Sequence, residues 1–194
     1  MTEAVSILKS GGVIVYPTDT AYALGCDATN EGAVKKIFEI KGREPSKTLP
    51  LIAGSIKMVA EWCEMPEKAE ELARKHWPGP LTLVLPVKKQ MLKQVQHDGF
   101  IAVRVPNSKT ACDLSKKLGV PLVSTSANKA GEPSCYTVNA VKQSLGDAFN
   151  AIDCVIDEGP LPEKKVSTIV KVWDNEVTII REGAVDIKNE NQKQ

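Results

Sequence analysis

Short apolar runs alternate with amphipathic stretches along most of this chain. Runs of β-forming residues predict strands at residues 13–16, 49–53, 81–86, 101–105, 122–124 and 154–157. Apolar residues at helical spacing predict helices at residues 3–10, 29–40, 55–62, 66–76, 109–118 and 137–145. Residues 167–173 and 176–181 are typical of a hairpin that turns at Asp174-Asn175.

This order of elements predicts the fold class. Strands alternate with helices through the first two-thirds of the chain and a hairpin closes it. We therefore expect an α/β or α+β fold with an open, twisted, mixed sheet flanked by helices. The first strand is expected to be central and to end near Tyr16, because Pro17 has no N–H for a sheet ladder. We predict a single domain over residues 1–187 and a loose polar tail over residues 188–194.

Composition and charge narrow the classes of function. Hydrophobic residues make up 42% and charged residues 25% of the chain, which is ordinary globular usage. The net charge of +1 predicts no general attraction to nucleic acid, so any basic surface must be local. The apolar runs are too short to span a bilayer, and residues 1–10 lack the features of a signal peptide. No membrane association is expected.

The cysteines and histidines point away from a disulfide framework and from a metal site. The five cysteines are well separated and contain no C-x-x-C pair, which is typical of reduced thiols in a cytoplasmic protein. His76 and His97 lack metal-ligand spacing, so we read both as structural or surface residues and predict no metal site.

Three polar segments follow apolar elements and are candidates for chemistry. Thr18-Asp19-Thr20 comes directly after the first strand, where open α/β sheets hold their ligands, although a plain polar turn would use the same residues. Ser124 to Asn128 offers hydroxyls and an amide within one turn, and it would equally suit a helix N-cap. Lys41-Gly42-Arg43, with Lys47, ends a predicted helix, where cations also favour the helix dipole.

Basic residues are concentrated around Lys41-Gly42-Arg43. Residues 35–57 hold six basic and two acidic side chains, a balance that suits a polyphosphate and would also suit a nucleic-acid surface. Arg104 lies within an apolar strand, where it either faces a buried partner or reaches solvent from an edge strand. The chain has no Walker lysine loop and no Ser-His-Asp or Cys-His arrangement. An enzyme of this composition would work by positioning and charge neutralisation.

Seven short motifs occur in order along the chain. They are Tyr16-Pro17-Thr18-Asp19-Thr20, Lys41-x-Arg43, Trp77-Pro78-Gly79-Pro80-Leu81-Thr82, Val103-Arg104-Val105-Pro106, Ser124-Thr125-Ser126-Ala127-Asn128, Ser167-Thr168-Ile169 and Arg181-x-Gly183. Each motif is weak singly, but seven in the same order are specific. From Gly11 to Gly183 the chain resembles the YrdC/TsaC family, the L-threonylcarbamoyladenylate synthases.

This resemblance implies a nucleotidyltransferase that condenses L-threonine, bicarbonate and ATP into threonylcarbamoyl-AMP and releases pyrophosphate. ATP would be a substrate, and Mg²⁺ would accompany it without a dedicated protein site. Transferase partners would then move the threonylcarbamoyl group to adenosine 37 of tRNA, the t6A modification. The family's fold has a concave basic surface, which would allow contact with tRNA.

The resemblance also assigns roles to matching positions. Threonine would be held by Thr20, Arg104, Ser124 and Ser167. ATP would be held by Arg43, Lys47, Ser126, Ser134 and Arg181, with main-chain contacts near Phe100. The residues associated with activity would be Lys41, Arg43, Ser126 and Asn128. We expect Lys41 and Arg43 on a solvent-facing loop, so that replacing either with alanine lowers activity with little loss of fold.

Three alternatives stay open at this point. One is a regulator that binds ATP without a reaction of its own, from which threonine-dependent ATP turnover would distinguish a synthase. The stretch Tyr22-Ala23-Leu24-Gly25 departs from the commonest family pattern and resembles a paralogous branch, the YciO-like proteins. That branch tends to lack the complete K-x-R and S-A-N set that this chain has. A non-catalytic protein that binds tRNA or double-stranded RNA would also use a basic concavity, but it gives no reason for a hydroxyl-rich loop beside Arg104.

Overall fold

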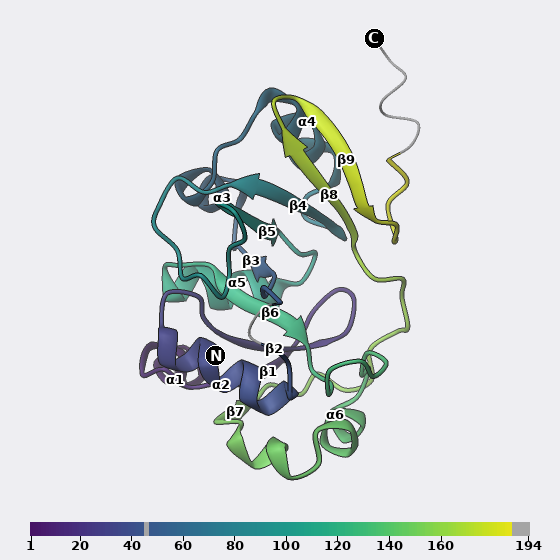
Figure 1. Ribbon diagram of the computed structural model, residues 1–194. Coiled ribbons are helices and arrows are strands. Elements are labelled where there is room, and N and C mark those ends of the chain that lie inside the picture. Colours follow the sequence, from purple (N-terminus) through teal and green to yellow (C-terminus); the bar gives the residue numbers. More distant parts are fainter. Residues whose placement is uncertain (45–46, 188–194) are drawn as a thin grey trace.

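The computed structural model describes residues 1–44 and 47–187, and the predicted tail at 188–194 lies outside these residues. One mixed sheet organises the described chain (Figure 1). Its strands are β1 (Ile14–Pro17), β2 (Tyr22–Asp27), β3 (Leu51–Ile52), β4 (Leu81–Pro86), β5 (Phe100–Arg104), β6 (Leu122–Ser126), β7 (Cys154–Val155), β8 (Thr168–Trp173) and β9 (Glu176–Arg181). Their order is β7-β1-β2-β6-β3-β5-β4-β8-β9. The pairs β1/β7, β3/β5 and β4/β8 are parallel, and the other neighbours are antiparallel.

Helices pack against both faces of this sheet. They are α1 (Thr2–Lys9), α2 (Glu31–Lys41), α3 (Ile56–Trp62), α4 (Glu67–His76), α5 (Lys109–Leu118), α6 (Val138–Leu145) and the 3₁₀ helix η1 (Gly146–Ala151). The predicted mixed sheet flanked by helices is therefore confirmed. No helix among residues 1–44 and 47–187 combines the length and the apolar character needed to cross a membrane.

The two faces of the sheet are covered unequally. Alternate residues of β4, such as Leu83 and Leu85, belong to the main core cluster together with residues of α2, α3, α4 and α6. On the opposite face, α1 and α5 form a smaller cluster over Tyr16, Ile52 and Leu122. The open face is the remainder of that second face, over β4, β5, β8 and β9, to which the described helices of the second cluster do not extend. The side chains of β4 and β5 that point there are Thr82, Val84, Phe100, Ala102 and Arg104.

Helix α2 has well-defined ends, which place the basic residues at its carboxyl terminus. The side chain of Asn30 accepts a hydrogen bond from the backbone N–H of Ala33 at 3.0 Å and caps the first turn. Gly42 ends the helix in the left-handed conformation, with φ of 57°, which glycine adopts at little cost. Lys41 thus occupies the last helical turn, and Arg43 is the first residue beyond the cap.

Most predicted elements match the structure, and β2 is the main one that the sequence reading missed. Residues 18–21 form a tight turn in which the Thr18 N–H donates to the Ala21 carbonyl at 3.1 Å, so the chain returns at once as an antiparallel strand. The prediction that the first strand is central is wrong, because β7 pairs with its outer edge and β1 is second from the end. The strand predicted at 122–124 continues to Ser126, so Ser124 and Ser126 lie on a strand rather than in a loop.

We predict that Gly25→Ala destabilises the fold. A Cβ on Gly25 would lie 2.5 Å from Cε1 of Tyr16 and 3.0 Å from the carbonyl oxygen of Val123, both in the packed interior. The packed neighbours must shift to make room for this Cβ, which is expected to lower the free energy of unfolding by about 1–3 kcal/mol. Urea denaturation followed by circular dichroism measures the loss.

Gly32→Ala in α2 is the matched control for this prediction. A Cβ there would meet only Oδ1 of Asn30, at an ordinary 3.5 Å, so the variant should be as stable as wild type or gain up to about 1 kcal/mol. Equal stabilities for the two variants would contradict the close packing inferred at Gly25.

Candidate active site

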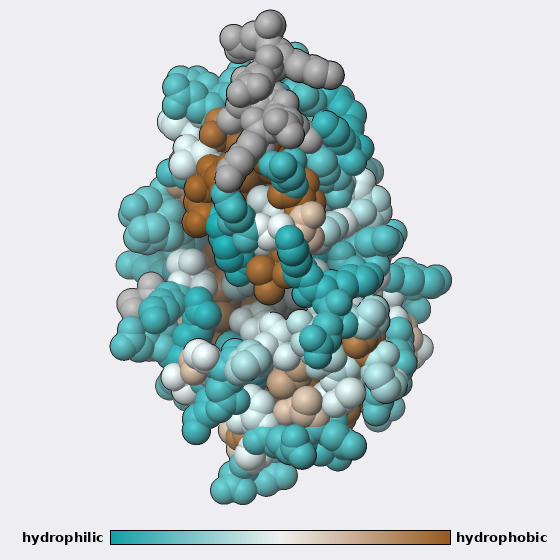
Figure 2. All heavy atoms as spheres, turned by 90° about the vertical axis from the view of Figure 1, so that its right-hand side faces the viewer, coloured by the Kyte–Doolittle hydropathy of each residue, from teal (hydrophilic) through white to brown (hydrophobic). Residues whose placement is uncertain are grey.

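A cavity of about 660 Å³ occupies the open face of the sheet. This volume lies within the range of roughly 300–1,000 Å³ that is usual for small-molecule sites. Figure 2 shows a hollow on this side of the molecule, with apolar residues in its walls and hydrophilic residues around it. The predicted site residues that line the cavity are Thr20, Arg43, Phe100, Arg104, Ser124, Ser126, Ser134, Ser167 and Arg181. Segments that are distant in the sequence therefore converge on one site.

Arg104 is buried and paired, at 8% exposure. Its Nη1 donates to Oδ1 of Asp19 at 2.6 Å, and its Nη2 donates to Oγ1 of Thr20 at 3.2 Å. The other carboxylate oxygen of Asp19 accepts from the backbone N–H of Asn107 at 3.1 Å. Since β5 lies inside the sheet between β3 and β4, the alternative of an edge-strand arginine that reaches solvent is wrong.

The hydroxyl of Thr20 faces the cavity as a hydrogen-bond acceptor. Thr18 Oγ1 donates its only proton to the carbonyl of Ala21 at 2.7 Å, so in the 3.1 Å contact between the two threonine hydroxyls Thr20 is the donor. Thr20 also accepts from Arg104. Its remaining capacity is a lone pair, which fits an N–H group of a ligand.

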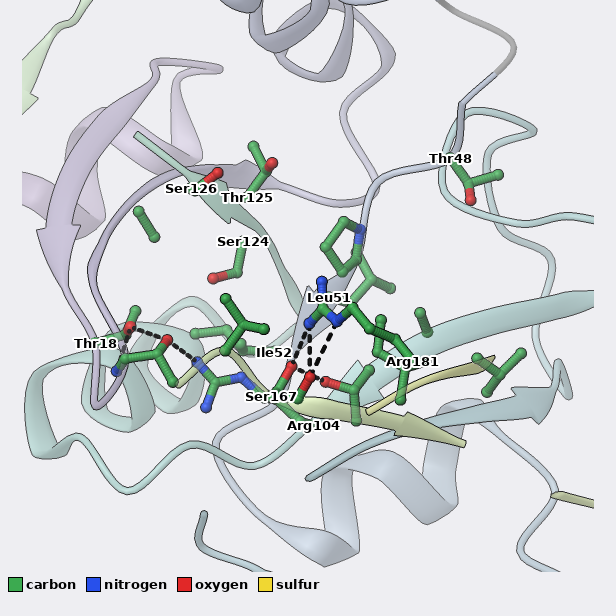
Figure 3. Close-up of a pocket in the computed structure, with 18 of the residues that line it drawn as sticks. Thr18, Thr48, Leu51, Ile52, Arg104, Ser124, Thr125, Ser126, Ser167 and Arg181 are labelled. Carbon is green, nitrogen blue, oxygen red and sulfur yellow. Dashed lines mark hydrogen bonds between the residues drawn. The ribbon is translucent and has the colours of Figure 1, made fainter. Parts of the chain in front are cut away.

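Arg181 and Ser167 form a second polar group, which lines the cavity near Arg104 (Figure 3). Arg181 Nη2 donates to Oγ of Ser167 at 3.0 Å and to its carbonyl oxygen at 2.7 Å, and Nε donates to the same carbonyl at 3.1 Å. Burial, and then the nearby charge of Arg104, lower the pKa of Arg181. Two guanidinium groups that repel each other in this way favour an anion between them.

Arg43 is held by its own loop, in a position that faces the cavity. Its Nη2 donates to the carbonyl of Thr48 at 2.9 Å and its Nε to that of Lys47 at 3.3 Å. Burial lowers the pKa of Arg43. Lys47, predicted to bind ATP, is exposed and contributes its carbonyl to Arg43, and it does not line the cavity.

Lys41 corrects the expectation of a solvent-facing loop, because it is 2% exposed. Its Nζ donates to the carbonyl of Ser126 at 2.5 Å, the carbonyl of Asn128 at 2.7 Å and Oδ1 of Asn128 at 3.1 Å. Burial lowers the pKa of Lys41 to about 8, and the charge of Arg43 contributes to this shift. An ammonium group has three donors, and three oxygens already use them. Lys41 therefore lies behind the cavity rather than in it.

Asn128 completes this buried cluster. Its Oδ1 accepts from Ser126 Oγ at 2.5 Å, and its Nδ2 donates to the carbonyls of Glu132 and Pro133. Asn128 is buried and does not line the cavity. The alternative that Ser124 to Asn128 caps a helix is wrong, because irregular chain follows β6 before α6 begins at Val138. Lys41 and Asn128 together hold the segment that carries Ser126 and Ser134.

The sequence reading missed cavity-lining residues on β4 and β8, among them Thr82, Ile169 and Lys171. Lys171 places its Nζ 3.9 Å from the centre of the Phe100 ring, a cation–π contact at the cavity wall. The alternation of side chains along β4 could have identified Thr82 from the sequence. In Leu81 to Leu85 every second residue is a leucine of the core, so Thr82 and Val84 must point to the other face.

Comparison with known proteins identifies the family. The Sua5/YciO/YrdC family model, described as "Telomere recombination", matches residues 6–183. The chain belongs to the Sua5/YciO/YrdC family. It is 35% identical over 188 residues to the threonylcarbamoyl-AMP synthase of Pyrococcus abyssi, which covers 95% of this chain and 54% of that protein. Other curated relatives with the same name are 33–39% identical.

Solved structures of the family share the fold. Sua5 from P. abyssi, crystallised with L-threonine, superposes with a TM-score of 0.89 at 32% identity, over 98% of this chain and 56% of that one. YciO from E. coli superposes with a TM-score of 0.83 at 30% identity, over 96% and 90%. The chain spans about half the length of the P. abyssi and Bacillus subtilis synthases, 54% in each case. It spans 94% of the synthase of Idiomarina loihiensis.

We predict that Lys41→Ala destabilises the protein. The variant removes a buried donor that three oxygens share. The Ser126 carbonyl keeps the N–H of Asn128, and Oδ1 of Asn128 keeps the hydroxyl of Ser126. The carbonyl of Asn128 loses the donor described for it, which is expected to cost about 1–3 kcal/mol of unfolding free energy. Thermal and urea unfolding measure the difference.

Lys35→Ala in the same helix is the control. Lys35 is exposed and lies 4.0 Å from Glu39, so its removal should change stability by less than about 0.5 kcal/mol. If Lys41→Ala proved as stable as Lys35→Ala, Lys41 would not be holding this cluster together.

Proposed function

We propose that this chain is a threonylcarbamoyl-AMP synthase that joins L-threonine, bicarbonate or CO₂, and ATP. The observation that carries the proposal is one cavity with two kinds of lining. Hydroxyls and the guanidinium of Arg104 suit a small amino acid, and the further cations Arg43 and Arg181 suit a triphosphate. The names of the curated relatives and the L-threonine bound to P. abyssi Sua5 support this assignment.

The threonine end is proposed to lie between Thr20 and Ser167, with Ser124 beside them. Thr20 offers a lone pair to an N–H of the α-amine, while Arg104 and Ser167 offer donors to the carboxylate. Asp19 keeps Arg104 oriented, since it is bonded to both the guanidinium and the Asn107 backbone. An amino acid carries one donor end and one acceptor end, which matches this arrangement.

The ATP end is proposed to lie along Arg43, Ser126, Ser134 and Arg181, with Phe100 at the wall. Basic side chains dominate the described lining, with Arg43, Arg104, Lys164, Lys171 and Arg181 against the single carboxylate of Asp98. This balance suits the charge of a polyphosphate. Mg²⁺ is proposed to enter bound to ATP rather than through protein ligands of its own.

The proposed reaction has two steps. The neutral threonine amine attacks the carbon of CO₂ and gives up one proton to solvent, or attacks bicarbonate with loss of water, and in either case a carbamate forms. A carbamate oxygen then attacks the α-phosphorus of ATP, and the bond to the bridging oxygen breaks, so pyrophosphate leaves with the electron pair. Arg43 and Arg181 are proposed to stabilise charge on the phosphates, and the hydroxyls to hold threonine in line.

Lys41 and Asn128 are proposed to support activity indirectly. Both are buried and bonded to the Ser126 segment, so they fix the position of Ser126 and Ser134 without touching substrate themselves. The product would pass to transferase partners that modify tRNA, with direct tRNA contact at the basic mouth of the cavity as a further proposal. Such a reaction belongs in the cytoplasm, where tRNA is modified.

A YciO-like activity is the second candidate, favoured by the TM-score of 0.83 to E. coli YciO. Non-catalytic RNA binding is a third. Only the synthase requires that threonine and bicarbonate both accelerate release of pyrophosphate from ATP, whereas an RNA-binding protein would show steeply salt-dependent RNA affinity and no such turnover.

We predict that wild-type protein releases pyrophosphate from ATP only when threonine and bicarbonate are both present. Arg43→Ala should lower kcat/KM for ATP by about 100-fold, because a positioned donor is lost from the charge-stabilising site. A coupled pyrophosphate assay measures both effects.

Arg74→Ala is the matched control, because Arg74 lies on α4, which packs on the opposite face, and pairs with Glu70 at 3.4 Å. It should keep wild-type rates. Turnover that ignores threonine, in a folded sample, would contradict the proposed synthase.

A further inference from the structure

Thr82 lies beside the proposed threonine site but has no assigned role. It sits on β4, is 4% exposed, and its Oγ1 lies 2.9 Å from Oγ of Ser167 on the connection into β8. Among the described residues, Ser167 is the hydrogen-bond partner of the Thr82 hydroxyl. The two residues are 85 positions apart in the sequence and meet because β4 and β8 are parallel neighbours.

The direction of the bond between these hydroxyls follows from the available partners. A guanidinium can only donate, so Arg181 donates to Ser167 Oγ. The buried proton of Thr82 needs an acceptor, because a buried donor that is left without one is destabilising. Ser167 Oγ is the acceptor within reach, so Thr82 donates to it as well.

Two donors directed at Ser167 determine what its own proton can do. With both lone pairs of Oγ in use, the Ser167 O–H points away from Thr82 and Arg181, which leaves the cavity that Ser167 lines. Ser167 is thereby a fixed donor, in contrast to the acceptor Thr20 on the other polar group.

We propose that Thr82 is a positioning residue that holds the Ser167 hydroxyl as a donor toward an acceptor-only group of the substrate, the carboxylate of the amino acid. This inference rests on the proposed function for the identity of the amino acid. A carboxylate fits because Arg104 and Arg181 add positive charge at the same place.

The test is isothermal titration of the purified full chain with L-threonine. Thr82→Val keeps the branched shape and removes the hydroxyl, so Ser167 becomes free to turn, and affinity should fall by about threefold to tenfold. Thr82→Ser restores the hydroxyl and should recover most of that affinity. Because Thr82 acts through Ser167, the double variant Thr82→Val/Ser167→Ala should bind threonine no more weakly than Ser167→Ala alone.

Thr168→Val is the control for buried threonine as such. Thr168 is 1% exposed, and its hydroxyl is bonded to Val185 rather than to the cavity, so this variant should lose stability and keep threonine affinity. Any of three results would overturn the proposal. Thr82→Val could bind threonine as tightly as wild type, Thr82→Val and Thr82→Ser could lose equal affinity, or the losses could add in the double variant.

The titration does not depend on turnover, so the two proposals fail separately. Wild-type protein that binds threonine but releases no pyrophosphate would overturn the synthase, and the affinity ratios of the variants would still decide the role of Thr82. Wild-type protein that binds no threonine would overturn both.

Discussion

The unequal covering of one sheet is the constraint on which the rest of this structure depends. Successive residues of a strand point to opposite faces, so each strand that supplies a leucine to the core also supplies the next side chain to the other side. On β4 and β5 the core face is packed by helices, and the opposite face is left for a cavity of about 660 Å³. The same strands therefore supply both the leucines of the core and the side chains that line the cavity.

Two buried cations, Lys41 and Arg104, differ in how many of their hydrogen-bond donors are already used by neighbouring acceptors. The ammonium of Lys41 has three donors and meets three oxygens, so it is saturated and serves to hold neighbouring chain. The guanidinium of Arg104 has five donors, and the bonds to Asp19 and Thr20 leave others free for a ligand. The two cations, which belong to different motifs, thus differ in their hydrogen bonding: Lys41 is saturated, and Arg104 keeps donors that a ligand could use.

The hydroxyls of Thr20 and Ser167 differ in whether each is left to accept or to donate a hydrogen bond in the cavity. Thr20 gives its proton to Thr18 and is left as an acceptor, while Ser167 receives two donors and is left as a donor. A site with one acceptor and one donor, beside two guanidinium groups, is suited to the amine and the carboxylate of an amino acid. The hydrogen bonds of neighbouring residues, among them Thr18 and Thr82, set this polarity.

Local pattern in the sequence determined the helices and most strands, including β4 at 81–86 and α5 at 109–118, because periodicity and caps act over a few residues. The ordered motifs also determined the family. Only the tertiary structure decided that residues 22–27 pair as β2, that Lys41 is buried, and that Arg104 meets Asp19. Thr82 and Ser167 likewise become partners only when β4 and β8 align. Lys41, Arg104 and Thr82 meet these partners 85 to 87 positions away in the sequence, and periodicity within one segment does not encode such contacts.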